Sequence, residues 1–148
     1  MDIMTRFGAY AADFEKTLAD DDWSRLHDYF AEDAVYAVES EAFPCRLVGR
    51  DRIFTGIKKS LDGFDRKFDG RDISITSGPE VDGDEMRVAW SLTYRKEGVP
   101  PYTLAGRTRV RYRDGKIVEL VDSYAPGAGD AGAAWSRETG IALDPSYV

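Results

Sequence analysis

Hydrophobic and polar residues alternate most regularly between residues 102 and 124, on either side of Arg113-Asp114-Gly115. This alternation predicts two half-buried β-strands joined as a hairpin. Two different turns fit the triplet. A two-residue loop at Asp114-Gly115 would place Arg113 opposite Lys116, whereas a three-residue turn closed by a glycine bulge would place Tyr112 opposite Lys116.

The amphipathic pattern favours the bulged turn, because a register change of one residue moves every side chain to the other face relative to its partner strand. In the bulged register Arg109 lies across from Glu119, which is a favourable cross-strand pair. Asp122 lies opposite Gly106, which leaves room for a close approach. A carboxylate on an apolar face must be paired, hydrated or have a raised pKa. The residues expected on this face are Leu104, Gly106, Thr108, Val110, Tyr112, Val118, Leu120, Asp122 and Tyr124.

Apolar residues recur at helical spacing in three other stretches, which predict three helices. The first covers residues 3–19, with Phe14 on its apolar stripe, and ends at Asp20-Asp21-Asp22. Asp21 or Asp22 caps the second helix, because a carboxylate suits a helix N-terminus. The third follows Gly49-Arg50-Asp51. The buried stripes of the second and third helices are Trp23, Leu26 and Phe30, and Ile53, Ile57, Leu61 and Phe64.

Three more strands are expected before the hairpin, at residues 35–39, 71–77 and 86–96. Tyr36 and Val38 share one face of the first strand. The Gly-Pro pair that follows the second strand is expected to end it.

The composition changes after the hairpin. Residues 126–132 contain only Pro, Gly, Ala and Asp, which predicts a flexible hinge. A short helix is expected at residues 133–138, with Trp135 as its anchor, and such an aromatic could cover a pocket or dock on a partner subunit. We therefore expect one domain at residues 1–125 and a Gly/Ala-rich tail at residues 126–148.

Composition and charge narrow the class of protein. The chain has 148 residues, of which 43% are hydrophobic and 32% are charged, as in a globular domain with a core. Its net charge of −7 argues against non-specific binding of nucleic acid. No apolar run approaches the roughly 20 residues of a membrane-spanning helix, and the first ten residues lack a secretion signal. We expect a cytoplasmic protein that contacts neither nucleic acid nor membrane.

Few catalytic groups are available. Cys45 is the single cysteine, so an intrachain disulfide is impossible. His27 is the single histidine, so a histidine-rich metal site within one chain is excluded. The sequence has no glycine-rich phosphate loop, no H-E-x-x-H and no G-x-S-x-G. A curved sheet with inward aromatics and one isolated acid predicts instead a cavity for an apolar small molecule, without a cofactor.

Asp122 is the candidate general acid or base of this cavity, with a pKa raised by its apolar surroundings. Tyr36 is the candidate donor of a hydrogen bond to developing negative charge, although tyrosines in strands are usually core residues. His27 is either an acid–base group or a hydrogen-bonded residue at the edge of the core. The residues expected to shape the binding site are Phe14, His27, Val38, Trp90, Thr108, Leu120 and Tyr124.

The order of elements resembles the nuclear transport factor 2 superfamily, and within it the SnoaL-like polyketide cyclases, ketosteroid isomerases and limonene epoxide hydrolases. The resemblance covers about residues 5–125 and rests on WSRLHDYFAEDAVY at residues 23–36, Gly49-Arg50-Asp51, and Asp114-Gly115-Lys116-Ile117 with Asp122 behind it. It implies an α+β fold, in which a cone-shaped, curved antiparallel sheet wraps around N-terminal helices and encloses a pocket.

The catalytic residues of these relatives are only partly present. Phe14, Val38 and Thr108 stand where ketosteroid isomerases have their tyrosine, general base and second acid. Tyr36 and Asp122 match a tyrosine and one acid of limonene epoxide hydrolases, and Asp122 could supply the single acid of the polyketide cyclases. In the epoxide hydrolases an asparagine corresponds to Val38 and an Arg-x-Asp pair to Trp90 and Leu92.

Two functions therefore stay open. The first is a cofactor-free isomerase, cyclase or hydrolase acting on an apolar small molecule. The second is a non-catalytic module for small-molecule binding or dimeric assembly. The resemblance also implies a homodimer, and the outer sheet face with Arg107, Arg109, Glu119 and Val121 is the expected interface, because a two-fold contact can pair arginines with acids.

Overall fold

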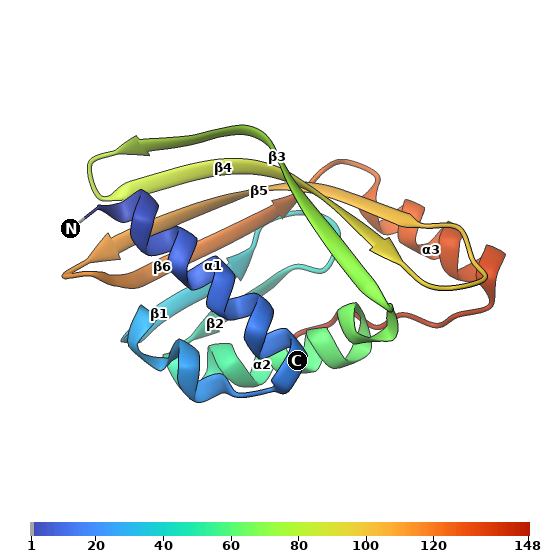
Figure 1. Cartoon of the computed structure of the whole chain (residues 1–148), viewed down its shortest axis with the longest axis horizontal. Coiled ribbons are helices and arrows are strands. Elements are labelled where there is room, and N and C mark those ends of the chain that lie inside the picture. The colour runs from blue at the N-terminus through green and yellow to red at the C-terminus, as the bar shows by residue number, and fades with distance from the viewer. Residues whose placement is uncertain (1) are drawn as a thin grey trace.

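The computed structural model describes residues 2–148 of the chain, which form an α+β fold (Figure 1). The elements in chain order are α1 (Ile3–Asp20), the 3-10 helix η1 (Trp23–Tyr29), β1 (Phe30–Val38), β2 (Cys45–Val48), α2 (Arg50–Gly63), the 3-10 helix η2 (Asp65–Lys67), β3 (Gly70–Asp82), β4 (Glu85–Arg95), β5 (Tyr102–Arg113), β6 (Lys116–Tyr124) and α3 (Ala128–Thr139).

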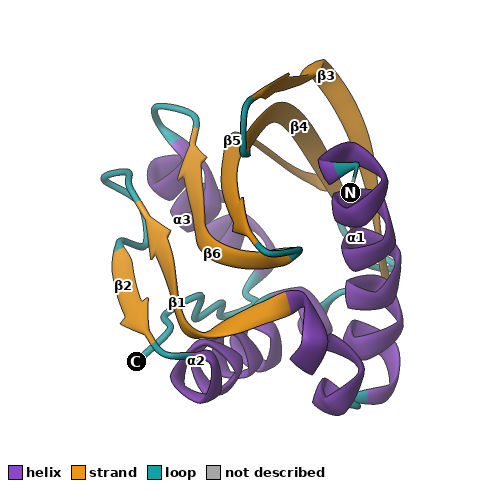
Figure 2. Ribbon diagram, turned by 90° about the vertical axis from the view of Figure 1, so that its left-hand side faces the viewer, coloured by secondary structure: helices purple, strands orange, loops and turns teal. Residues whose placement is uncertain are grey.

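The strands of residues 2–148 form one six-stranded sheet in the order β2-β1-β6-β5-β4-β3. Neighbouring strands are antiparallel, except that β1 runs parallel to β6. The sheet is strongly curved but not closed, and α1 and α2 lie against its concave side (Figure 2). This arrangement confirms the predicted fold class and leaves room for a cavity between the helices and the sheet.

The β5–β6 hairpin corrects the predicted turn. Asp114 and Gly115 form a two-residue turn with φ of 53° and 79°, and Arg113 pairs with Lys116. The register then shifts between Arg111 and Tyr112. This bulge adds one residue to β6, so the predicted faces still hold beyond it although the predicted turn was wrong.

The partners of individual hairpin residues change accordingly. Asp122 faces Thr108, and Gly106 faces Tyr124. The space at Gly106 is filled by Trp90, whose ring lies 2.8 Å from the position that a Cβ would take. Arg109 faces Val121, yet its guanidinium still reaches the carboxylate of Glu119 diagonally at 2.7 Å.

Two element boundaries also differ from the expectation. Phe30 begins β1 instead of closing the preceding helix, and it is fully buried there. The third strand, β3, does not end at Gly78-Pro79. A register shift between Ser77 and Glu80 lets it continue to Asp82. It is therefore a long edge strand, largely exposed, beside the cavity.

The segment expected to be a flexible hinge is mostly helical, because α3 begins at Ala128. Trp135 anchors α3, since its ring packs 5.1 Å from that of Phe68 and its Nε1 donates a 2.8 Å hydrogen bond to the carbonyl of Pro100. Residues 140–148 then run back along α2 (Figure 1). None of the helices within residues 2–148 is long and apolar enough to cross a membrane.

Candidate functional site

A cavity of about 470 Å³ lies between α1, α2 and the concave face of the sheet. Its walls are mainly apolar and aromatic. Met4 of α1 and Ile73 and Ile75 of β3 line the cavity and are 44%, 57% and 54% exposed, which places an opening between α1 and β3. The predicted site residues that line the cavity are Phe14, Tyr36, Trp90, Thr108, Leu120, Asp122 and Tyr124.

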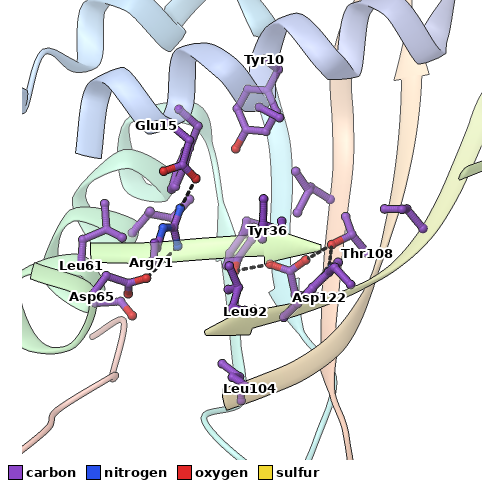
Figure 3. A pocket seen from close by; sticks show the side chains of 18 of the residues that line it. Tyr10, Glu15, Tyr36, Leu61, Asp65, Arg71, Leu92, Leu104, Thr108 and Asp122 are labelled. Atoms are coloured by element: carbon purple, nitrogen blue, oxygen red, sulfur yellow. Dashed lines mark hydrogen bonds and ion pairs between the residues drawn. The ribbon is translucent and has the colours of Figure 1, made fainter. Parts of the chain in front are cut away.

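Asp122 is the acid of this cavity, and fixed donors hold both of its oxygens (Figure 3). The hydroxyl of Tyr36 donates to Oδ2 at 2.8 Å, and that of Thr108 donates to Oδ1 at 2.6 Å. Trp90 Nε1 donates to the Thr108 hydroxyl at 2.8 Å. An indole nitrogen can only donate, so the single hydrogen of Thr108 is free to point at Asp122. Three strands, β1, β4 and β5, thus orient one carboxylate on β6.

Burial dominates the electrostatics of this group. Desolvation raises the pKa of Asp122, and the hydrogen bonds from Thr108 and Tyr36 only partly oppose this rise. Burial, followed by the nearby charge of Asp122, raises the pKa of Tyr36 well above 10. Tyr36 is therefore a neutral donor at physiological pH, and Asp122 holds its proton more strongly than an ordinary aspartate does. Such a pair can exchange a proton with a bound molecule.

Tyr147 is a member of the site that the sequence interpretation missed. It lies in the tail, two residues after Pro145, and it lines the cavity. Its hydroxyl lies 3.4 Å from that of Tyr36 and 3.2 Å from that of Tyr124. Burial raises its pKa to about 12. Trp135 and Tyr147 are both aromatic residues that follow the glycine-rich segment. The sequence predicted a role for Trp135 only, and its ring packs instead on Tyr102 of β5 and on Phe68, which follows η2.

A second polar cluster lines another part of the same cavity (Figure 3). Arg71 of β3 contacts Asp65 at 2.8 Å and Glu15 of α1 at 2.6 Å. The hydroxyl of Tyr94 donates to Asp65 at 3.0 Å. The Arg71–Glu15 pair joins β3 to α1 at the side of the cavity where the opening lies. Arg71 also lies 5.7 Å from the centre of the Phe14 ring, a cation–π contact.

Two predicted residues do not lie on the cavity wall. His27 has a side chain that is 52% exposed and contacts Asp28, so it is a surface residue of η1. Val38 pairs with Asp122 across β1 and β6 but is packed in the core, 2% exposed. Among residues 2–148, no group of three or more His, Cys, Asp or Glu side chains is placed to hold a metal ion.

A curved, open six-stranded sheet with helices on its concave side is the nuclear transport factor 2-like α+β fold. The model of the SnoaL-like domain matches residues 11–120. The chain therefore belongs to the SnoaL-like domain family, as the sequence resemblance predicted. No curated protein matches the chain significantly in sequence.

Solved structures share the fold. A putative isomerase from Bacillus subtilis is 18% identical with a TM-score of 0.67, covering 97% of this chain and 100% of its own. A hypothetical protein from Catenulispora acidiphila with a ketosteroid isomerase-like fold, in complex with trimethylamine, is 22% identical with a TM-score of 0.60, covering 84% of this chain and 88% of its own. An epoxide hydrolase of the limonene epoxide hydrolase-like type from M. tuberculosis is 15% identical with a TM-score of 0.58, covering 93% and 98%. At these identities the likeness shows the fold alone.

Proposed function

We propose that this chain binds an apolar small molecule in its cavity and converts it by acid–base catalysis without a cofactor, in an isomerisation, cyclisation or hydrolysis. One observation carries the proposal. Asp122 is a carboxylate held by Tyr36 and Thr108 on the wall of an otherwise largely apolar cavity of about 470 Å³. A cavity of this size is typical of small-molecule sites. A few fixed polar groups in an apolar wall are also typical of them.

Asp122 is the proposed acid–base group and Tyr36 the proposed hydrogen-bond donor. A raised pKa brings a carboxyl group nearer to neutral pH, where a general acid or base works best. Tyr36 stays protonated and can stabilise an oxyanion that forms next to Asp122. Trp90, Phe14, Leu120 and the other cavity residues would exclude water from the bound molecule. One solved structure with this fold is described as a putative isomerase and another as an epoxide hydrolase, and both reactions fall within the proposed class.

A second function has its own support. Both oxygens of Asp122 already accept short hydrogen bonds from side chains of the chain itself, as a purely structural carboxylate would. In that case the protein is a binding module without chemistry. The two functions differ in one result, because binding without chemistry survives the loss of Asp122 and leaves the ligand unchanged.

We also propose that the outer face of the sheet forms a homodimer. This face has a hollow of about 390 Å³ whose lining includes Arg107, Arg109 and Glu39. Charges of both signs on one patch suit a two-fold contact, in which each arginine meets an acid of the other copy. Arg109 is already paired with Glu119 within the chain, so Arg107 is the more available cation of this face.

The functional test is a thermal-shift screen with a panel of steroids, terpenoids, aromatic polyketides and fatty acids, followed by product analysis for every ligand that binds. The wild type, Asp122→Asn and Tyr36→Phe are compared. A ligand at a hundred times its Kd stabilises the protein by about 2.7 kcal/mol. Conversion by the wild type that Asp122→Asn abolishes supports the enzyme. Binding to both proteins without conversion supports the binding module, and no binding by any class contradicts both.

A further inference from the structure

The last residues of the chain are docked on α2. The backbone N–H of Asp144 donates to the carbonyl of Gly63 at 2.9 Å, and the hydroxyl of Ser60 donates to the carbonyl of Pro145 at 2.8 Å. Lys59 Nζ donates to the hydroxyl of Ser146 at 2.7 Å. We call residues 140–148 the C-terminal strap. Its path along α2 brings a residue far away in the sequence to the cavity wall.

The helix surface under the strap is made of small residues. Gly56, Ser60 and Gly63 are spaced by four and three positions, so they lie on one face of α2. A Cβ on Gly63 would overlap the carbonyl oxygen of Asp144, and one on Gly56 would lie 3.0 Å from the carbonyl oxygen of Tyr147. Glycine in a helix costs stability relative to alanine. Here its absent side chain is what lets the strap approach the helix backbone.

The strap carries Tyr147 into the site. This residue is 8% exposed, and its ring centre lies 5.6 Å from that of Tyr36. Tyr36 gives its only hydroxyl hydrogen to Asp122, so its oxygen can only accept from Tyr147. Tyr147 must in turn accept from Tyr124. The three hydroxyls thus form a one-way chain of hydrogen bonds, Tyr124 to Tyr147 to Tyr36, that ends on the carboxylate.

We infer that Tyr147 is a positioning residue of the site, delivered by the C-terminal strap, which directs the Tyr36 hydroxyl at Asp122 and closes the cavity wall behind it. A hydroxyl that accepts a hydrogen bond becomes a stronger donor, because successive hydrogen bonds polarise one another. Tyr147 therefore strengthens the bond from Tyr36 to Asp122 without touching Asp122 itself. The inference rests on the proposed function in one respect only, namely that Asp122 is the acid–base group.

The surroundings of Asp122 make a clean titration possible. The titratable groups that face it are Tyr10 of α1, Tyr36 and Cys45 of β1 and β2, Tyr124 of β6 and Tyr147 of the strap. Burial raises the pKa of each of them, that of the Cys45 thiol to about 11. All are neutral while a carboxylate titrates, so a change in the Asp122 midpoint reports on its hydrogen bonds and its access to water.

The test is a pH titration of the Asp122 side-chain carboxyl by ¹³C NMR on the ligand-free protein, with Asp122→Asn to assign the signal. Tyr147→Phe is expected to move the midpoint upward, because the carboxylate keeps a weaker donor. Tyr36→Phe moves it upward further, because that donor is lost. Tyr112→Phe is the matched control, since the buried Tyr112 hydroxyl has no hydrogen-bond partner within residues 2–148.

A second variant separates the hydrogen bond from the wall. Gly63→Ala in the Tyr147→Phe background displaces the strap after the hydrogen bond from Tyr147 has been removed, so water that reaches Asp122 lowers the midpoint relative to Tyr147→Phe alone. If Tyr147→Phe leaves the midpoint where Tyr112→Phe leaves it, Tyr147 does not position Tyr36 and the inference is wrong. If Gly63→Ala leaves the midpoint of the Tyr147→Phe protein unchanged, the strap is not the cavity wall at Asp122. These titrations need no ligand. The proposed function can therefore fail while this inference stands, and this inference can fail while the proposed function stands.

Discussion

Replacing glycine by alanine at two helix positions is expected to have opposite effects on stability. Gly8 lies in the middle of α1, where an added Cβ would meet no atom within 4 Å. Gly63 is the last residue of α2, where an added Cβ overlaps the carbonyl oxygen of Asp144. A backbone atom cannot turn away as a flexible side chain can, so the strap must move at Gly63→Ala.

The magnitudes follow from these surroundings. Gly8→Ala is expected to raise the free energy of unfolding by about 0.8–1.0 kcal/mol, the difference in helix propensity. Overpacking at Gly63 costs about 1–3 kcal/mol. The hydrogen bonds from Asp144 to Gly63 and from Ser60 to Pro145 are worth about 0.5–1.5 kcal/mol each, and the moving strap weakens both. Overpacking and the weakened hydrogen bonds result from the same displacement of the strap, so they are alternatives and are not added. We therefore expect Gly63→Ala to lower the free energy of unfolding by about 1–3 kcal/mol.

Urea unfolding followed by circular dichroism measures both changes, and thermal unfolding gives a second reading. In a chain of this size about 1 kcal/mol shifts the Tm by roughly 2–4 °C. The Tm should therefore rise by about 2–4 °C in Gly8→Ala and fall by at least about 2 °C in Gly63→Ala. A Gly63→Ala protein that is as stable as the wild type would refute the docking of the strap on α2.

Three other predictions concern the site, the tail and assembly. Folding raises the pKa of Asp122, so its ionised form opposes folding. The wild type should therefore gain stability relative to Asp122→Asn as pH falls through the raised pKa toward about 3.9, the value in the unfolded chain. Urea unfolding at several pH values measures the difference in free energy of unfolding between the two proteins, and a difference independent of pH would contradict the raised pKa. Trp135→Ala should lower the free energy of unfolding by about 3–5 kcal/mol, because this buried ring anchors α3. A loss below about 1 kcal/mol in chemical unfolding would show that α3 is not anchored there. Gel filtration with light scattering should give a dimer at micromolar concentration, weakened by high salt if Arg107 pairs with acids across the interface, and a monomer at both low and high salt would exclude the proposed dimer.

The faces of the hairpin could be predicted from the sequence, but its turn could not. Alternation shows only whether a residue lies on one face or the other, and the two-residue turn followed by a bulge at Val118 gives the same faces as a three-residue turn. The face of Asp122 was therefore correct, while its partner was Thr108 and not Gly106. Which residue faces Asp122 depends on the position of the extra residue in β6, and the alternation of hydrophobic and polar residues does not reveal that position.

His27 shows how a wrong helix type misplaces a residue. Four positions after Trp23, it shares nearly the same face if the helix has about 3.6 residues per turn. The segment is a 3-10 helix with about three residues per turn, so His27 points about 120° away from Trp23 and toward solvent. His27 was a candidate acid–base group because it is the single histidine of the chain.

Tyr147 and the Arg71 cluster could not be predicted for a different reason. Tyr147 meets Tyr36, and Arg71 meets Glu15, across 111 and 56 residues of chain, respectively. Such contacts exist only once α1, α2 and the sheet have packed together. The sequence pattern could identify Asp122 and the site residues Tyr36, Trp90 and Thr108, but not the hydrogen bonds that join them or the part that Tyr147 plays.

The most direct test of the central claim, that the cavity binds an apolar small molecule, is a methyl NMR titration of protein labelled at its isoleucines. Ile57, Ile73 and Ile75 line the cavity, whereas Ile53 and Ile117 are buried away from its wall. We predict that a ligand from the panel shifts the methyl signals of the three lining residues in a saturable way and leaves those of Ile53 and Ile117 in place. A panel in which no ligand moves the lining signals, or in which ligands move only the others, would contradict the account.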